Sequence, residues 1–319
     1  MRILSGIQPS GKLHLGNYFG ALQQFEVFQQ RGAELFLFVA DWHALTTTKE
    51  SQELIQRTRE IAAAFLAFDL TAPRTYLYRQ SQVPAVLELA WLLSCLAPVG
   101  LLERAVSFKD KLARGLTANV GLFNYPILQA ADILSLQPDR VPVGKDQQQH
   151  LEITRVLASK FNKTFKANLK LPEPVLPPKA AVVPGTDGQK MSKSYGNTLD
   201  LFASAKDLRK QIRRIKTDSK SLGEALNPQS CNVFQIFQLV APKQAPQLAQ
   251  QYLAGEVGYG EAKNLLWQAI SVRFAEARKK FVELMAQPVK IEQALERGAK
   301  QARWEAQKTL QQVRSLVGY

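Results

Sequence analysis

The chain has 319 residues, of which 46% are apolar and 21% charged, and its formal net charge is +14. These values are typical of a water-soluble globular protein that is long enough for two domains, and the charge favours a nucleic acid or nucleotide partner over a neutral metabolite. Two distant cysteines, Cys95 and Cys231, exclude a disulfide framework, and the N-terminus has no apolar signal core, so we expect a cytoplasmic protein.

The first 81 residues alternate between strand and helix patterns. The predicted strands span residues 2–7, 34–45 and 75–81, and the predicted helices span residues 17–32 and 51–70. Residues 34–45, ELFLFVADWHAL, form a continuous apolar run, which is typical of a strand buried on both faces of a parallel sheet. The helix at 51–70 has Ser51 as its candidate N-cap.

Residues 83–102, VPAVLELAWLLSCLAPVGLL, are nearly apolar over the length of a bilayer span. Glu88, two prolines and a glycine interrupt the run. We therefore expect a buried helix over about residues 84–97, with a subunit contact as a candidate location, rather than a membrane span.

The rest of the chain changes character near residue 170. Apolar helices continue to about residue 135, followed by a strand at 140–144 and a helix at 147–161. Alternating strands and helices predict a doubly wound α/β domain with a parallel sheet. Five of the 16 prolines lie in residues 170–189, and the remainder is predicted to be helical at residues 203–216, 229–240, 243–254, 259–286 and 289–316.

The densest basic run, ASAKDLRKQIRRIKTDSK at residues 203–220, begins with the predicted helix at 203–216. Its helical spacing places four cations on one face and an apolar stripe of Leu208, Ile212 and Ile215 on the other. The four cations are Lys206, Arg209, Lys210 and Arg213. The basic face is a candidate contact for RNA backbone or nucleotide phosphate, and a solvated surface helix is the alternative.

The stretch SGIQPSGKLHLGN at residues 5–17 is the first motif that carries chemistry. Gly6, Gly11 and Lys12 match G-x-x-x-x-G-K of a phosphate-binding loop, but Leu13 stands where that loop needs Ser or Thr. The H-x-G-N that follows, at residues 14–17, suits a strand-to-helix turn that faces a nucleotide. Gly16 would let an adenosine lie against the backbone, and a cationic His14 would be the stronger phosphate donor.

The second motif is KMSKS at residues 190–194, within GTDGQKMSKSYGN. Lysines three residues apart, among glycines and hydroxyls, suit a loop that closes on a polyphosphate and neutralises the charge that develops there. An exposed basic loop is the alternative for this segment alone.

The two motifs together, in this order, resemble the class I aminoacyl-tRNA synthetases. Further stretches resemble the tryptophanyl-tRNA synthetases: SGIQPSG, ERAVSFKDK, GLFNYPILQAADIL, VPVGKDQQQHLEITR and TDS at 217–219. The resemblance implies tryptophan–tRNA ligase activity. A tyrosyl-tRNA synthetase and a non-catalytic synthetase-like tryptophan-binding paralogue are the alternatives.

The resemblance implies a Rossmann-like catalytic domain followed by a smaller all-helical C-terminal domain. We place the first at residues 1–188, and the second, with the KMSKS loop and the tRNA anticodon-binding helices, at residues 189–319. Its last helix would pack back on the catalytic domain. The implied substrates are tryptophan, ATP with Mg²⁺, and tRNA, bound by a homodimer with no membrane or DNA partner.

The family's functional residues carry over onto matching positions. The candidate tryptophan-binding residues are Leu4, Ser5, His43, Tyr125, Gln129, Asp132, Ile133, Val141, Val143 and Gln147. The candidate ATP-binding residues are Gln8, Ser10, Gly16, Asn17, Gly144, Asp146, Lys190, Met191, Ser192 and Lys193. The candidate catalytic residues are His14, Asn17, Lys111, Lys190 and Lys193, with no metal ligand among them.

Asp132 carries the amino-acid specificity in this scheme. In the family it accepts the indole N–H, the one hydrogen-bond donor of that ring system. A buried Asp paired with an Arg is the alternative, and Val141 and Val143 read equally well as ordinary strand core. Three positions depart from the family pattern: Gln129 replaces a common Met, Leu4 a frequent aromatic, and Trp42 a smaller polar residue.

Overall fold

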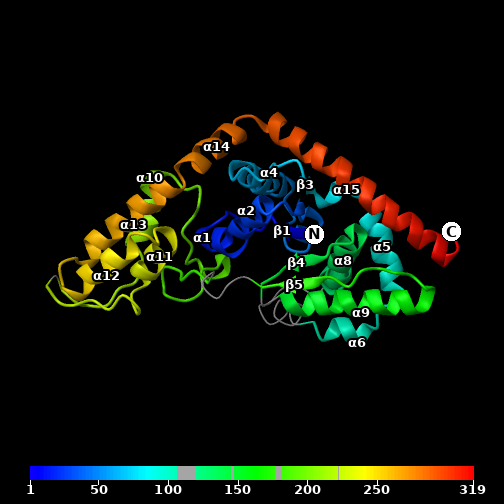
Figure 1. Ribbon diagram of the computed structural model, residues 1–319, viewed down its shortest axis with the longest axis horizontal. Helices are drawn as coiled ribbons and strands as arrows, with labels where there is room; N and C mark the ends of the chain where they lie inside the picture. The colour runs from blue at the N-terminus through cyan, green and yellow to red at the C-terminus, as the bar shows by residue number, and fades with distance from the viewer. Residues whose placement is uncertain (106–118, 145–146, 177–181, 222) are drawn as a thin grey trace. The chain divides into compact units, whose positions relative to one another are not determined.

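The computed structural model describes residues 1–105, 119–144, 147–176, 182–221 and 223–319 (Figure 1). The chain forms two compact units. Unit 1 comprises Met1–Ser10, Phe25–Pro177 and Leu284–Tyr319, and unit 2 comprises Gly11–Gln24 and Pro178–Glu283. Residues 11–24 and 182–188, which the sequence division groups with the catalytic domain, therefore lie in unit 2, whereas the last helix lies in unit 1.

Unit 1 is built on a five-stranded parallel sheet with the order β3-β2-β1-β4-β5. The strands are β1 (Arg2–Ile7), β2 (Glu34–Val39), β3 (Thr75–Arg79), β4 (Arg140–Pro142) and β5 (Glu173–Val175). In β2 every residue after Glu34 is buried, as expected for a central strand covered on both faces. The order turns back at β1, between β2 and β4, which confirms the doubly wound α/β architecture.

The predicted strand at 34–45 is too long. The strand ends at Val39, and α3 (Asp41–Ala44) follows directly. Asp41 ends the extended run because its carboxylate accepts hydrogen bonds from the backbone N–H groups of Trp42 and Ser81, at 3.1 and 3.0 Å. This turn places α3 at the carboxyl end of the sheet, where ligands bind in open α/β folds.

Helices pack around this sheet. They are α2 (Gln23–Gln30), α4 (Ser51–Ala67), α5 (Ala85–Ser94), α6 (Val99–Glu103), α8 (Val120–Leu136), α9 (Gln148–Phe165) and α15 (Pro288–Val317). The N-cap of α4 is Glu50, so the prediction of Ser51 was wrong by one residue. Along α15, drawn in red in Figure 1, Gly298 lies so close to β3 that a Cβ there would stand 2.0 Å from the Leu77 carbonyl oxygen. The glycine thus permits the approach of helix to strand.

The apolar segment at 83–102 forms two short helices, α5 and α6, in unit 1. Val86, Leu89, Leu92 and Leu93 of α5 are buried in the core. Within the described part of the chain, no helix is both long and apolar enough to cross a membrane.

Unit 2 is mostly helical, as predicted for the second domain. It holds α1 (Leu15–Asn17), a π-helical turn (Tyr18–Leu22), α10 (Ala205–Arg213), α11 (Asn232–Val240), α12 (Ala245–Leu253), α13 (Tyr259–Arg273) and most of α14 (Ala275–Met285). The single helix predicted at 259–286 is divided at Phe274. The buried Phe274 ring contacts Tyr18 edge-on at 4.9 Å, a tertiary contact that the helical pattern does not contain.

Candidate functional site

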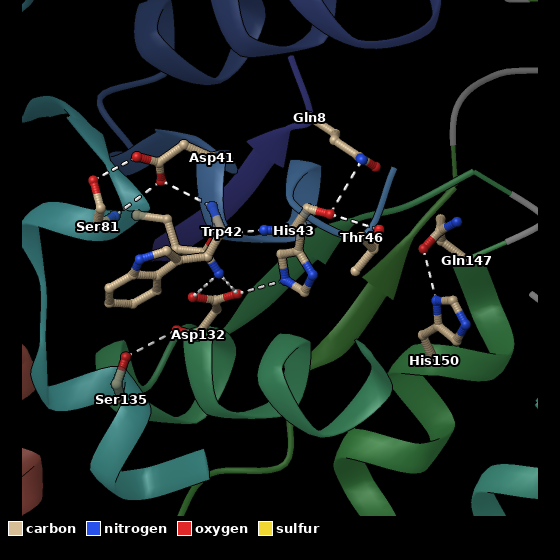
Figure 2. Close-up of polar contacts among 11 residues, drawn as sticks. Gln8, Asp41, Trp42, His43, Thr46, Ser81, Asp132, Ser135, Gln147 and His150 are labelled. Carbon is tan, nitrogen blue, oxygen red and sulfur yellow. Dashed lines mark hydrogen bonds and ion pairs between the residues drawn. The ribbon is translucent and has the colours of Figure 1, made fainter. Parts of the chain in front are cut away.

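Asp132 of α8 lies in the interior of unit 1, with its carboxylate held by two side chains (Figure 2). His43 Nε2 donates to Oδ2 at 3.0 Å, and Gln80 Nε2 donates to Oδ1 and Oδ2 at 3.0 and 2.8 Å. A carboxylate only accepts, so His43 Nε2 carries the hydrogen of this bond. Gln80 in turn accepts the backbone N–H groups of Trp42 and His43 through Oε1. We call Asp132, His43 and Gln80 the Asp132 cluster.

The Asp132 cluster contains His43 and Gln80 where the alternative from sequence expected an arginine. Burial raises the pKa of Asp132, and the hydrogen bonds from His43 and Gln80 oppose that rise. A carboxylate offers about four acceptor positions, and these contacts use three of them. The cluster can therefore accept one more N–H donor, which is what a single indole nitrogen offers.

Five further candidate residues for tryptophan are buried in unit 1. They are Leu4, Ser5, Ile133, Val141 and Val143, at 1%, 9%, 3%, 4% and 7% exposure. The four apolar ones belong to the same core cluster, so the alternative of strand core describes Val141 and Val143 as they stand. Their position toward a bound amino acid stays a prediction.

A chain of rings and amides connects other predicted residues of unit 1. Tyr125 lies 4.1 Å from the His43 ring and 5.6 Å from the His150 ring, measured between centroids. His150 Nδ1 donates to Gln147 Oε1 at 2.8 Å, and Gln8 Nε2 donates to the His43 carbonyl at 3.3 Å (Figure 2). The structure thus joins His43, Tyr125, Gln147 and Gln8 into one network.

Sequence reasoning missed Gln80 and His150 in this network. Both are 1% exposed. His150 follows Gln147 by three residues at the start of α9, which is the spacing of two residues on one helix face and could have identified it. Gln80 directly follows β3, and the sequence gave no such signal for it.

Gln129, one of the departures from the family pattern, is placed one turn before Asp132 on α8. Its Oε1 is buried and has no hydrogen-bond partner within the described structure. A buried acceptor of this kind is costly unless a donor reaches it. The substitution of the common Met therefore leaves an unsatisfied polar atom on the same helix face as Asp132.

In unit 2, the H-x-G-N turn and the segment after KMSKS are bonded to each other. Leu15 N donates to the Leu199 carbonyl at 3.0 Å, Leu201 N donates to the Leu13 carbonyl at 2.9 Å, and His14 pairs with Asp200 in an antiparallel bridge. We call residues 11–17 and 190–201 the signature loops. Leu13 is 5% exposed, so it packs under its loop and is no misplaced phosphate ligand.

His14 is 5% exposed, and burial together with the nearby Lys193 lowers its pKa to about 4. It is neutral at pH 7, so the stronger, cationic donor considered from the sequence is not what this structure holds. The space above Gly16 is also taken, since a Cβ there would lie 2.9 Å from His14 Nδ1 and 3.5 Å from Met191 Cβ. Gly16 thus accommodates the His14 imidazole, and its position toward an adenosine stays a prediction.

Asn17 has a structural role at the same turn. Its Oδ1 accepts the backbone N–H of His14 at 3.1 Å. Only the amide nitrogen of Asn17 can donate to a ligand.

The KMSKS loop is organised by a residue that sequence reasoning missed, Asn197. This side chain is 2% exposed, accepts the backbone N–H of Ser192 at 2.8 Å, and donates to the Lys190 carbonyl at 3.2 Å and to Asp187 Oδ1 at 2.8 Å. Met191, 4% exposed, anchors the loop in the interior of unit 2. An asparagine three residues after the motif was the signal available in the sequence.

The two lysines of the motif differ. Lys193 is partly buried and donates from Nζ to the Gly11 carbonyl at 2.9 Å, whereas Lys190 is exposed. Among the other ATP candidates, Ser10 is exposed and Gly144 accepts the Gln147 N–H at 2.9 Å. Lys111 and Asp146 lie outside the described residues.

The chain is similar to known proteins along its length. The family model described as tRNA synthetases class I (W and Y) matches residues 1–275. The chain is 45% identical over 319 residues to the tryptophan–tRNA ligase of Campylobacter jejuni strain RM1221, with both chains fully covered. It is 47% identical over 320 residues to that of Fusobacterium nucleatum, covering 99% of this chain and 98% of the relative.

A solved structure is similar over its full length. It is the tryptophanyl-tRNA synthetase of Campylobacter jejuni in complex with ADP and tryptophan, which is 44% identical, with a TM-score of 0.95 and 100% of both chains covered.

Proposed function

The chain belongs to the class I tRNA synthetases for tryptophan and tyrosine and joins tryptophan to tRNA, and we propose that the Asp132 cluster and the signature loops each carry out one part of this reaction. In the first step the tryptophan carboxylate attacks the α-phosphorus of ATP, and the bond to pyrophosphate breaks. In the second, the 3′-terminal ribose hydroxyl of tRNA attacks the acyl carbon, and AMP leaves. The product supplies protein synthesis.

The Asp132 cluster selects the amino acid in this proposal. The observation that carries it is the buried carboxylate with three of about four acceptor positions used, which leaves one for the indole N–H. His43 and Gln80 hold the carboxylate in place, so the acceptor is preorganised before tryptophan arrives. Leu4, Ile133, Val141 and Val143 supply the apolar wall, and Tyr125 and Gln147 bind the α-amino group.

The signature loops act on the phosphates. Lys190 and Lys193 stabilise the negative charge that develops as pyrophosphate leaves, while His14 and Asn17 donate hydrogen bonds to phosphate oxygens. Gln8 contacts the α-phosphate, Gly144 the ribose, and Met191 and Ser192 the nucleotide. The protein supplies no covalent nucleophile, and its contribution is positioning and electrostatics.

Magnesium enters this proposal only with the nucleotide. Within the described residues, no group of three or more His, Cys, Asp or Glu side chains could hold a metal ion. Mg²⁺ is usually held by substrate phosphates and water with few protein ligands, so we treat it as part of the ATP substrate. When bound it neutralises phosphate charge.

We also propose a homodimer that uses an exposed apolar face of α5. Leu87 and Trp91, one turn apart on this helix, are 49% and 68% exposed. Large apolar side chains exposed together on one helix face mark interaction surfaces. Sedimentation should show a dimer that Trp91→Glu converts to monomer, and a monomeric native protein would refute this face.

A cytoplasmic location agrees with a tRNA substrate and with two free cysteines, Cys95 and Cys231. Fractionation of cells with an antibody against the chain checks it. Enrichment outside the cytoplasm would contradict this part of the proposal.

Tryptophan-dependent ATP–pyrophosphate exchange is the test of the function. We expect exchange with tryptophan and none with tyrosine at the same concentration. Preference for tyrosine would contradict the assignment of Asp132. Tryptophan binding without exchange would support the non-catalytic alternative.

A further inference from the structure

A basic pocket lies in unit 2 between α10 and α13, outside the groups of residues described above. It encloses about 720 Å³, within the roughly 300–1,000 Å³ of small-molecule and cofactor sites. Its lining is Ala205, Lys206, Arg209, Lys210, Arg213, Arg214 and Trp267. The lining therefore contains five cations, one aromatic ring and no carboxylate.

The basic side of the pocket follows from how α10 packs. Leu208 and Ile212 on α10, and Ile215 just after it, are 0%, 1% and 2% exposed, so the apolar stripe is buried as its spacing predicts. The opposite side then faces solvent with its cations. The nearest acid on the helix, Asp207, accepts the Ser204 hydroxyl at 2.7 Å and does not line the pocket.

Trp267 of α13 is held in a fixed orientation at this pocket. Its Nε1 donates to the Ala205 carbonyl at 3.3 Å. The Arg209 guanidinium carbon lies 5.5 Å from the centre of the indole ring, and Arg209 Nη2 donates to Asn264 Oδ1 at 3.2 Å. The pocket thus presents an aromatic ring and a planar cation that are already positioned against each other.

We propose that this pocket binds an unpaired nucleotide of the tRNA, with its base stacked on Trp267 and Arg209 and its flanking phosphates at Lys206, Lys210, Arg213 and Arg214. Unpaired RNA is recognised by stacking on aromatic and guanidinium planes, and its backbone by lysine and arginine. The pocket combines both elements. The proposal rests on the proposed function, because tRNA is the second substrate only if the chain is a tRNA ligase.

Two properties of a bound nucleotide can be separated by substitution. Trp267→Ala removes the stacking surface, whereas Trp267→Phe retains a ring. Lys206→Glu places a negative charge in the pocket. The same substitution should stabilise helix α10, because residue 206 lies in its first turn, where an acidic side chain interacts favourably with the helix dipole. A loss of tRNA binding in Lys206→Glu therefore cannot be ascribed to a weakened helix.

The experiment uses the full chain, a tRNA(Trp) transcript and a matched control, Lys243→Glu, which makes the same charge change at an exposed lysine outside the pocket. We expect Trp267→Ala to raise the Kd for the transcript about 5- to 150-fold, and Trp267→Phe to recover most of it. Lys206→Glu should weaken binding and reduce the slope of log affinity against log salt by at least about 0.7. Lys243→Glu should match the native protein.

Exchange activity, measured without tRNA, distinguishes the possible failures. If the native chain shows no tryptophan-dependent exchange, the proposed function fails first. If exchange is present and Lys206→Glu and Trp267→Ala bind the transcript like the native chain, the pocket proposal is overturned. It is also overturned if Lys206→Glu leaves tRNA binding unchanged but raises the KM for ATP, since the pocket would then bind free nucleotide.

Discussion

The Asp132 cluster of unit 1 and the signature loops of unit 2 use buried polar groups in different ways. In the cluster, side chains bond to side chains: His43 and Gln80 both donate to the Asp132 carboxylate. In the loops, a buried side chain bonds mainly to backbone, since Asn197 holds the Ser192 N–H and the Lys190 carbonyl. The charged ends of Lys190 and Lys193 remain less buried than Asp132.

This difference indicates a division between selection and rate. A fully buried acceptor with fixed neighbours discriminates between ligands, because a ligand that lacks the matching donor leaves it unpaired. Lysines on a loop fixed through its backbone can interact with charge that appears only during the reaction. Substitutions in the cluster should therefore change the use of tryptophan, and substitutions in the loops should change the rate.

The largest effect is expected from Lys193→Ala. Removing one preorganised group that stabilises transition-state charge lowers kcat by about 100- to 1,000-fold. The KM for ATP should change far less, because the interaction is made mainly in the transition state. Initial rates of tryptophan-dependent ATP–pyrophosphate exchange, measured over a range of ATP concentrations, separate the two parameters.

Lys12→Ala is the matched control for Lys193→Ala. Lys12 is an exposed lysine of the same loops, next to the Gly11 carbonyl that Lys193 binds. We expect exchange in Lys12→Ala to remain near native. If Lys193→Ala raised the KM for ATP as much as it lowered kcat, Lys193 would bind ATP in the ground state. The proposed division between selection in the Asp132 cluster and rate in the signature loops would then be wrong. If Lys12→Ala were the damaging variant, the phosphate-loop hypothesis would return.

A smaller effect is expected from Asp132→Asn, and it should fall on the KM for tryptophan and not on kcat. The amide has one acceptor oxygen in place of two, and its NH₂ group opposes the Gln80 donor, which contacts both carboxylate oxygens. An unpaired buried group costs about 1–3 kcal/mol, so kcat/KM for tryptophan should fall about 5- to 150-fold, mainly through KM. Exchange kinetics with varied tryptophan measure this.

Ser135→Ala controls for packing near Asp132. Its hydroxyl, one turn further along α8, donates to the Asp132 backbone carbonyl at 3.0 Å and does not contact the carboxylate. Near-native kinetics for tryptophan are expected. A loss of kcat at constant KM in Asp132→Asn would show that selection and rate are not separated between the two regions.

The fold was largely predictable because its strongest signals are local. A central parallel strand is a continuous apolar run, and β2 is one, so its existence followed from residues 34–39. The ends of elements were not predictable to the residue. Val39 ends β2 because the Asp41 side chain bonds to Ser81, 40 residues away, and Phe274 interrupts a helical pattern because its ring packs on Tyr18.

Much of the candidate site could be identified by motif, but its internal partners could not. Gln80 lies 52 residues from Asp132, and nothing in its neighbours marks it as different from a surface glutamine. The protonation of His14 likewise depends on burial and on Lys193, which lies far along the chain. Motifs specify which residues act, whereas the three-dimensional surroundings decide their charge.

The last effect predicted is on stability, and it tests the charge state of His14 in the signature loops. Its pKa is about 4 in the folded chain and about 6.5 when unfolded. Between these values only the unfolded state binds the proton, so the stabilising effect of neutral His14 is complete above pH 6.5 and decreases as the pH falls toward 4. Linkage gives a loss of about 2 kcal/mol in the free energy of unfolding between pH 7 and pH 5. Urea unfolding of native chain and His14→Gln at both pH values measures it.

His14→Gln has no titrating group at this position, so its free energy of unfolding should decrease by about 2 kcal/mol less than that of the native chain over the same interval. Equal losses in both proteins would show that His14 titrates with its ordinary pKa of about 6.5, and the imidazole would then become a cationic donor as the pH falls below that value. A difference of the expected sign means that the loops exclude positive charge at His14, so that their positive charge comes from their lysines, among them Lys190 and Lys193. The signature loops then combine a buried neutral imidazole with cationic lysine side chains, whereas the Asp132 cluster contains no lysine and presents a buried hydrogen-bond acceptor.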